Sequence, residues 1–381
     1  MPVSRDDLLG GAADLVTSSS LEAARQYTIA QDLSRASKWR DAIDAYQSAL
    51  YLDPDLGRAY AGLAAASANL NRYEDTKKYY KEALKRIDRM TDRELHRTLG
   101  GYFLWTGDGK AAIKELTTLI EHYPADEAGL TNLAYASFLA RDMASAMELG
   151  RKAVSLYPKN ILERGNLALY AMYAGDFDAA YAESTRVLGL NPSYETAYVC
   201  QAVSELMRNH LPQAEEIYQK LAGVSALGAS FSAMGLADIA FYRGNLADAE
   251  SILELGAAAD ISGSHSNPGP KLAALAAARL LQGKTAEALQ AAGKAVAASK
   301  EPRVLFEAAY VYLDAARPRD ALALAKTLDG NFEPDTQVYA HLILGKSRLR
   351  PVAPKPTDAA RLVSFPRLGG LHHRYDWQQA A

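Results

Sequence analysis

Small and apolar residues recur along this chain at helical spacing, in a pattern that covers most of its length. An aliphatic residue followed by a small one marks the middle of each expected first helix and gives it an apolar stripe. These pairs are Ile29-Ala30, Leu63-Ala64, Leu99-Gly100, Leu133-Ala134 and Leu167-Ala168. A second helix is expected after each, since an alanine recurs twelve residues before several closing prolines. Those alanines are Ala42, Ala112, Ala146 and Ala180. The sequence therefore predicts a succession of antiparallel helix pairs.

The closing prolines measure the length of the repeat. Pro124, Pro158 and Pro192 lie 34 residues apart, and Pro54 precedes Pro124 by 70 because residues 87–93 include two extra positions. A period of 34 is typical of the tetratricopeptide repeat (TPR), a helix–turn–helix unit. With its looser later copies, the pattern predicts about nine units plus a half unit. The chain resembles bacterial TPR proteins, which implies an all-α, right-handed TPR superhelix, or α-solenoid.

Breaks in the repeat divide the chain into five predicted segments. They are an N-terminal leader or cap (1–22), a front TPR array (23–260), a Gly/Ser/Pro-rich loop or hinge (261–270), a rear TPR array (271–349) and an irregular basic tail (350–381). The loop has two interpretations, a surface insertion or a hinge between the arrays. The tail contains four prolines and no trace of the period. It is interpreted either as an irregular cap on the last repeat or as the mark of a truncated reading frame.

A narrower resemblance is carried by several stretches of the repeat region. They are SLEAARQYTIAQDL (20–33), LDPDLGRAYAGLAAASANL (52–70), RIDRMTDRE (86–94) and LALYAMYAGDF (167–177). They are similar to the TPR half of large bacterial eukaryotic-like serine/threonine kinases, which implies a sensory or docking role. The chain has no glycine-rich nucleotide loop, no H-R-D catalytic loop and no D-F-G, so phosphotransfer by this chain is not expected.

Charge and hydropathy exclude several classes of function. The 381 residues include 42 Lys or Arg and 45 Asp or Glu, for a net charge of -3. Seven of the basic and two of the acidic residues follow position 345, so the repeat body has 35 basic and 43 acidic residues. This acidic body argues against nucleic-acid binding, which favours broad positive charge. Without a long apolar run or a signal peptide, we expect a cytoplasmic protein with no membrane insertion.

The concave groove of a TPR solenoid, lined by the first helices, is the expected binding surface. Asn132 and Asn166 occupy the same place in consecutive units, and a carboxamide suits bidentate bonding to a peptide backbone. Asparagine at this place is also common in TPR sequences in general, so a purely structural role is the alternative. The other candidates for peptide binding are Arg97, Thr131, Tyr135 and Tyr173. Core packing is again the alternative for the aromatic residues.

Catalytic and metal-binding patterns are missing from the sequence. The seven histidines form no metal-ligating spacing, and neither a nucleophile elbow nor a P-loop occurs. We therefore predict no catalytic, cofactor or metal site. The predicted function is a non-catalytic TPR scaffold or adaptor that binds a peptide or partner protein in its groove. The alternative is a regulatory or sensory TPR module of a bacterial serine/threonine kinase system, split from or having lost its kinase domain, with that kinase as partner.

Overall fold

The computed structural model describes residues 17–36, 38–70, 72–263, 267–329, 334–348, 360–367 and 372–379. These residues form 19 α-helices, one 3-10 helix and two β-strands. The chain divides into two compact units, Met1–Ala174 (unit 1) and Gly175–Ala381 (unit 2). Most of the predicted leader (1–16) and the first part of the predicted tail (350–359) lie outside the described residues.

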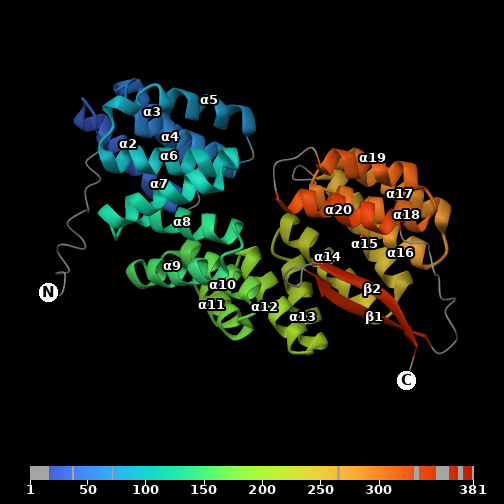
Figure 1. Cartoon of the computed structure of the whole chain (residues 1–381). Helices are drawn as coiled ribbons and strands as arrows, with labels where there is room; N and C mark the ends of the chain where they lie inside the picture. Colours follow the sequence, from blue (N-terminus) through green and yellow to red (C-terminus); the bar gives the residue numbers. More distant parts are fainter. Residues whose placement is uncertain are drawn as a thin grey trace. The chain divides into compact units, whose positions relative to one another are not determined.

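Unit 1 contains nine α-helices, which are coloured from blue to green in Figure 1. They are α2 (Leu21–Arg35), α3 (Trp39–Leu52), α4 (Gly57–Asn69), α5 (Tyr73–Leu84), α6 (Asp92–Thr106), α7 (Gly109–His122), α8 (Glu127–Leu139), α9 (Met143–Leu156) and α10 (Ile161–Ala174). The 3-10 helix η1 (Ile87–Arg89) lies between α5 and α6, where the two extra residues interrupt the period.

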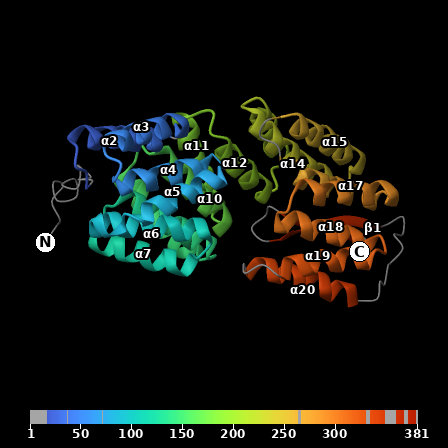
Figure 2. The ribbon, with the colours of Figure 1, turned by 90° about the horizontal axis from the view of Figure 1, so that it is seen from above.

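Unit 2 contains ten α-helices and a β-hairpin; Figure 2 shows several of its helices from above. The helices are α11 (Phe177–Leu190), α12 (Glu195–Met207), α13 (Leu211–Ala222), α14 (Ala226–Tyr242), α15 (Leu246–Ser262), α16 (Gly269–Leu281), α17 (Thr285–Ala298), α18 (Pro302–Asp314), α19 (Pro318–Asp329) and α20 (Pro334–Arg348). In sequence order, the described helices of the two units make nine pairs and a final single helix, as the repeat pattern predicts.

An aspartate recurs just before several of the second helices and explains why each of these helices begins there. Asp108, Asp142 and Asp176 lie 34 residues apart and cap α7, α9 and α11. Each side chain accepts a hydrogen bond from the backbone N–H three residues later, which satisfies one of the donors left open at a helix start. The turn before α7 also needs Gly107, whose φ of 78° is left-handed.

Small residues allow the paired helices to approach closely, as the sequence predicts. Ala42, Ala112, Ala146 and Ala180 are all fully buried. Glycine serves the same purpose where a tyrosine ring fills the space between helices. In unit 1 a Cβ on Gly62 would lie 2.3 Å from the ring of Tyr46. The aromatic residue therefore fits only because its neighbour has no side chain.

The predicted irregular tail instead contains an antiparallel hairpin. Strands β1 (Ala360–Arg367) and β2 (His372–Gln379) pair with Leu362 opposite Trp377. Alternating apolar residues on both sides of a Gly-Gly pair are a hairpin signal, which the four nearby prolines obscure in the sequence. The helical solenoid prediction is confirmed, and these two strands are a small addition to it.

The predicted loop at 261–270 falls between α15 and α16, with residues 264–266 outside the described ones. Helices α15 and α16 share one apolar cluster that includes Leu253, Ala257 and Leu272. A role of this loop as a hinge stays a prediction. Among the described helices, none combines the length and the apolar character needed to cross a membrane.

Candidate functional site

The first helices of successive pairs in unit 1 lie in contact with one another. Helix α4 contacts both α2 and α6, and α8 contacts both α6 and α10. We call these five helices the first-helix row. All six groove candidates from the sequence lie on its last three helices, α6, α8 and α10.

Asn132 and Asn166 lie one repeat apart on α8 and α10, and both are partly buried. Neither carboxamide makes a hydrogen bond to any described residue. Thr98 has the same repeat position on α6, but it is 1% exposed and accepts a bond from Arg58. The two asparagines therefore differ from the preceding repeat, because they keep donors and acceptors that the described part of the protein does not use.

Aromatic residues follow the two asparagines on the same helices, Tyr135 and Phe138 on α8 and Tyr173 on α10. Tyr135 is 43% exposed, whereas Phe138 is 8% exposed. The Phe138 ring stacks on Tyr135 with centroids 6.3 Å apart and meets the edge of Tyr173 at 5.0 Å. Phe138 is thus a core residue that supports the two tyrosines. Burial raises the pKa of the Tyr135 hydroxyl above its usual value.

Arg97 is engaged by a buried carboxylate that the sequence analysis did not single out. Its side chain is 8% exposed, and its Nη2 lies 2.6 Å from Oδ2 of the fully buried Asp126. Arg93 Nε donates to the same oxygen at 2.7 Å. The other oxygen, Oδ1, accepts from Gly129 N at 2.8 Å and so caps α8. Asp126 therefore fixes Arg93 and Arg97 against the start of α8.

Thr131 is also engaged within unit 1. Its hydroxyl donates to the carboxylate of Glu163 and lies 2.8 Å from the carbonyl of Glu127. Glu163 is 2% exposed, and burial raises its pKa to about 7, although the Thr131 bond opposes that shift and the charge of Glu127 adds to it. Contact of Arg97 or Thr131 with a ligand stays a prediction, because both side chains already serve internal networks.

A repeat signal could have found part of these networks. Asp126 and Asn160 are 34 residues apart, and each accepts backbone N–H bonds at the start of a first helix, α8 or α10. The Asn160 side chain also donates a hydrogen bond to the Glu127 carboxylate at 2.8 Å. That carboxylate forms an ion pair with Arg35 of α2, also at 2.8 Å. The 34-residue spacing could have predicted both helix caps. The charged partners of these caps could not be predicted in this way, because they depend on how the repeats pack against one another.

The histidine and cysteine residues described in the structure form no metal centre. His96 bonds Glu115 at 2.8 Å, and both His96 and His122 face Asp92. Nevertheless, no group of three or more potential ligands within the described residues has an arrangement that could hold a metal ion. Cys200 is fully buried, and burial raises the pKa of its thiol to about 12, so the thiolate is not formed at neutral pH.

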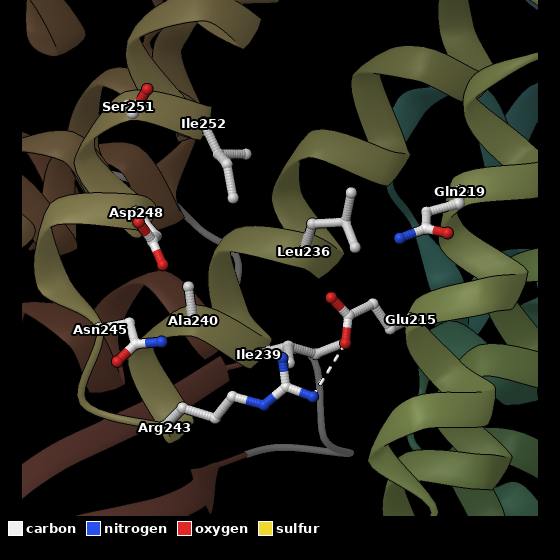
Figure 3. A pocket seen from close by; sticks show the side chains of 10 residues that line it. All are labelled: Glu215, Gln219, Leu236, Ile239, Ala240, Arg243, Asn245, Asp248, Ser251 and Ile252. Atoms are coloured by element: carbon white, nitrogen blue, oxygen red, sulfur yellow. Dashed lines mark hydrogen bonds and ion pairs between the residues drawn. The ribbon is translucent and has the colours of Figure 1, made fainter.

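Unit 2 contains a cavity of about 280 Å³ formed by α13, α14 and α15, which Figure 3 shows from close by. Leu236, Ile239 and Ile252 supply apolar lining. Arg243 Nη2 pairs with Glu215 Oε2 at 2.8 Å on the polar side, and this pair is the dashed line in Figure 3. None of the residues predicted from the sequence lies here.

Comparison with known proteins identifies the repeats and the fold. The model of the tetratricopeptide repeat family matches residues 27–89 and 99–161. A tetratricopeptide repeat protein from Parabacteroides merdae is 20% identical over 66% of this chain and 99% of its own, with a TM-score of 0.48. Human IFIT1, solved as a dimer with m7Gppp-AAAA, is 14% identical over 76% of this chain and 67% of its own, with a TM-score of 0.52.

Among curated proteins, none matches this sequence. The likeness to human IFIT1 extends to the helical fold alone, because the sequences are far apart. This likeness in fold, the family match and the nine helix pairs agree on the repeats and on the fold. Residues 27–89 and 99–161 are tetratricopeptide repeats, and the chain folds as an α-solenoid.

Proposed function

We propose that the protein is a non-catalytic scaffold or adaptor that binds an extended peptide, or an extended segment of a partner protein, along its first-helix row. Repeats of this family are typical of proteins that bind other proteins. The observation that carries the proposal is the pair of carboxamides on Asn132 and Asn166. They lie one repeat apart, are partly accessible, and have no hydrogen-bond partner among the described residues.

A peptide backbone matches this pair of carboxamides chemically. Each carboxamide offers two donors and one acceptor, so it can bond the N–H and C=O of one peptide residue at once. Tyr135 and Tyr173, on the same two helices as the asparagines, both pack on Phe138 and provide apolar surface for ligand side chains. Rigid aromatic side chains of this type often dominate the energy of protein interfaces. In this arrangement the asparagines fix the ligand's register and the tyrosines add affinity.

The test uses a peptide selected from a random library for binding to the intact chain. The double variant Asn132→Ala/Asn166→Ala should bind that peptide roughly tenfold or more weakly, because each lost carboxamide removes bonds worth about 0.5–1.5 kcal/mol. Asn69→Ala is the matched control, since the Asn69 side chain bonds only the carbonyl of Ala65 within its own helix. Unchanged affinity in the double variant would contradict this proposal.

The alternative proposal is a regulatory or sensory module of a bacterial serine/threonine kinase system. It is supported by the resemblance of residues 20–33, 52–70, 86–94 and 167–177 to the repeats of such kinases. Stimulation of kinase autophosphorylation by added wild-type chain, but not by Asn132→Ala/Asn166→Ala, would favour this alternative over a general adaptor. The predicted cytoplasmic location also stays a prediction.

A further inference from the structure

The two asparagines of the proposed peptide site share their helix faces with large apolar side chains. On α8, Tyr135 and Leu139 follow Asn132 by three and seven residues, so all three side chains leave the same side of the helix. Leu169 and Tyr173 follow Asn166 in the same way on α10, one repeat later. We call these six residues the α8–α10 face.

The α8–α10 face is continuous and open to a ligand. Tyr135 is 43% exposed and Leu139 is 49% exposed, whereas Leu169 and Tyr173 are partly buried. The rings of Tyr135 and Tyr173 both contact Phe138, so the apolar surface passes from one helix to the next. An exposed apolar patch with a few polar groups inside it is typical of a binding surface.

The α8–α10 face carries no formal charge, since it consists of two asparagines, two tyrosines and two leucines. Two charged residues of the same helix row, Arg97 and Glu163, are buried and engaged within unit 1. A charged ligand side chain on this face would lose water without meeting an opposite charge there. The face therefore matches an uncharged segment.

The corresponding face of α6 differs and limits the site to two helices of unit 1. Thr98 stands in the place of the asparagines, but it is buried and already bonded to Arg58. Three residues later α6 has Gly101, where α8 has a tyrosine and α10 a leucine. A Cβ at Gly101 would lie 2.9 Å from the Tyr80 hydroxyl, so a larger side chain has no room at this place.

The spacing of the two helices selects the conformation of the ligand. Helices α8 and α10 are in contact, and the axes of contacting helices lie about 8–10 Å apart. A polyproline II (PPII) segment advances about 9.3 Å in each turn of three residues. Side chains three residues apart therefore leave a PPII segment on the same side, at about the spacing of the helices. A β-strand repeats its side about every 6.6 Å, which does not match one helix spacing.

The carboxamides favour the same conformation. A PPII segment has no internal hydrogen bonds, so its backbone N–H and C=O groups are available to Asn132 and Asn166. An α-helical ligand uses these groups for its own bonds. Proline lacks the N–H and is excluded from the residues that the asparagines bond, but at the other positions it holds the PPII conformation. Grooves lined by aromatic residues are a recurring surface for such segments.

We propose that the α8–α10 face binds an uncharged, proline-containing PPII segment with a bulky apolar side chain at every third residue. The segment is the peptide of the proposed function, on which this inference rests. One apolar side chain contacts Tyr135 and Leu139, and the next contacts Leu169 and Tyr173. The contact spans two turns of the segment, or about six residues.

The first experiment compares synthetic, end-capped and fluorescently labelled peptides by anisotropy with the intact chain. The reference peptide repeats Leu-Pro-Gln three times. An isomer of the same composition with its leucines two residues apart should bind at least about fivefold more weakly, because only one leucine then reaches the face. Replacing the prolines with valine, which favours strands, should weaken binding at least about threefold. Equal or tighter binding of either peptide would overturn the inference.

A charged peptide and a pair of variants test the apolar contact. Glutamate in place of the leucines of the reference peptide should weaken binding at least about tenfold. Leu139→Gln should weaken binding of the reference peptide about fivefold. Leu52→Gln is the matched control, because Leu52 is 42% exposed but belongs to the second helix α3, and it should bind like wild type. Equal affinities of these two variants would overturn the inference.

The double variant Asn132→Ala/Asn166→Ala separates this inference from the proposed function. Equal binding of the reference peptide and its isomer, lost in the double variant, would overturn the PPII conformation and leave the peptide site intact. Binding of the library-selected peptide that the double variant leaves unchanged would overturn both. No saturable binding of the reference peptide below about 1 mM would overturn the inference alone, provided that the library-selected peptide still requires the asparagines.

Discussion

Replacing Glu163 with glutamine tests the electrostatics of the first-helix row most sharply. The wild-type carboxyl is 2% exposed, and burial raises its pKa from the usual 4.5 to about 7. The native state therefore holds this proton more tightly than the unfolded state does. The contribution of Glu163 to the stability of the wild-type protein should therefore fall as the pH rises from about 4.5 to about 7 and should then level off, because unfolding releases the proton in that window.

Glutamine removes the ionisation and keeps an acceptor for the Thr131 hydroxyl. A pKa difference of about 2.5 units corresponds to about 3 kcal/mol at roughly 1.4 kcal/mol per unit. Glu163→Gln should therefore be more stable than wild type by up to about 3 kcal/mol at pH 8, and by close to nothing at pH 4.5.

The assay is urea unfolding followed by circular dichroism at pH 4.5, 6, 7 and 8. The control is Glu148→Gln, a substitution on the exposed surface of α9, for which we expect no pH-dependent difference from wild type. A difference for Glu163→Gln that is the same at every pH would refute the reasoning. Destabilisation at pH 8 would refute it as well, since it would mean that the charged carboxylate stabilises the fold.

Two further substitutions test packing and the Asp126 network. Gly62→Ala should lower the free energy of unfolding by about 1–3 kcal/mol, measured in urea, because its Cβ would lie 2.3 Å from the Tyr46 ring. Asp126→Ala should cost about 3–5 kcal/mol in the same assay at pH 7, because it leaves the largely buried Arg97 without its carboxylate and α8 without its cap.

Matched variants show which outcome would contradict each expectation. Gly189→Ala places a methyl group in open space within α11 and should stabilise by roughly 0.5–1 kcal/mol. If Gly62→Ala behaved the same way, the close approach to Tyr46 would be wrong. Asp142→Ala removes an exposed cap of α9 and should cost about 1 kcal/mol. An equal cost for Asp126→Ala would mean that its ion pairs contribute nothing.

The fold could be predicted because the same packing of two antiparallel helices recurs in each repeat. Buried alanines such as Ala112 and Ala146 recur at one place, since two helices approach closely only there. Asp108 and Asp142 lie 34 residues apart because each caps the start of the second helix in its repeat. The C-terminal hairpin could not be found in this way, because it occurs once and its prolines suggested an irregular segment.

The charged networks were hidden for a different reason. Asp126 meets Arg97, 29 residues away, only after α6 and α8 have packed side by side. The repeat itself does not encode this pair, since Thr131 occupies the position that follows Arg97 by one period. Arg58 was missed likewise, because it meets Thr98, 40 residues away, only after α4 and α6 have packed against each other. Pairing and burial of single charges are tertiary properties that one repeat period does not reveal.

We propose that the first-helix row binds an extended peptide through Asn132 and Asn166. The most direct measurement is fluorescence anisotropy of a library-selected, labelled peptide titrated with wild type, Asn132→Ala/Asn166→Ala and Asn69→Ala. We expect the double variant to bind roughly tenfold or more weakly, and Asn69→Ala to bind like wild type. Equal affinity of all three proteins would contradict it.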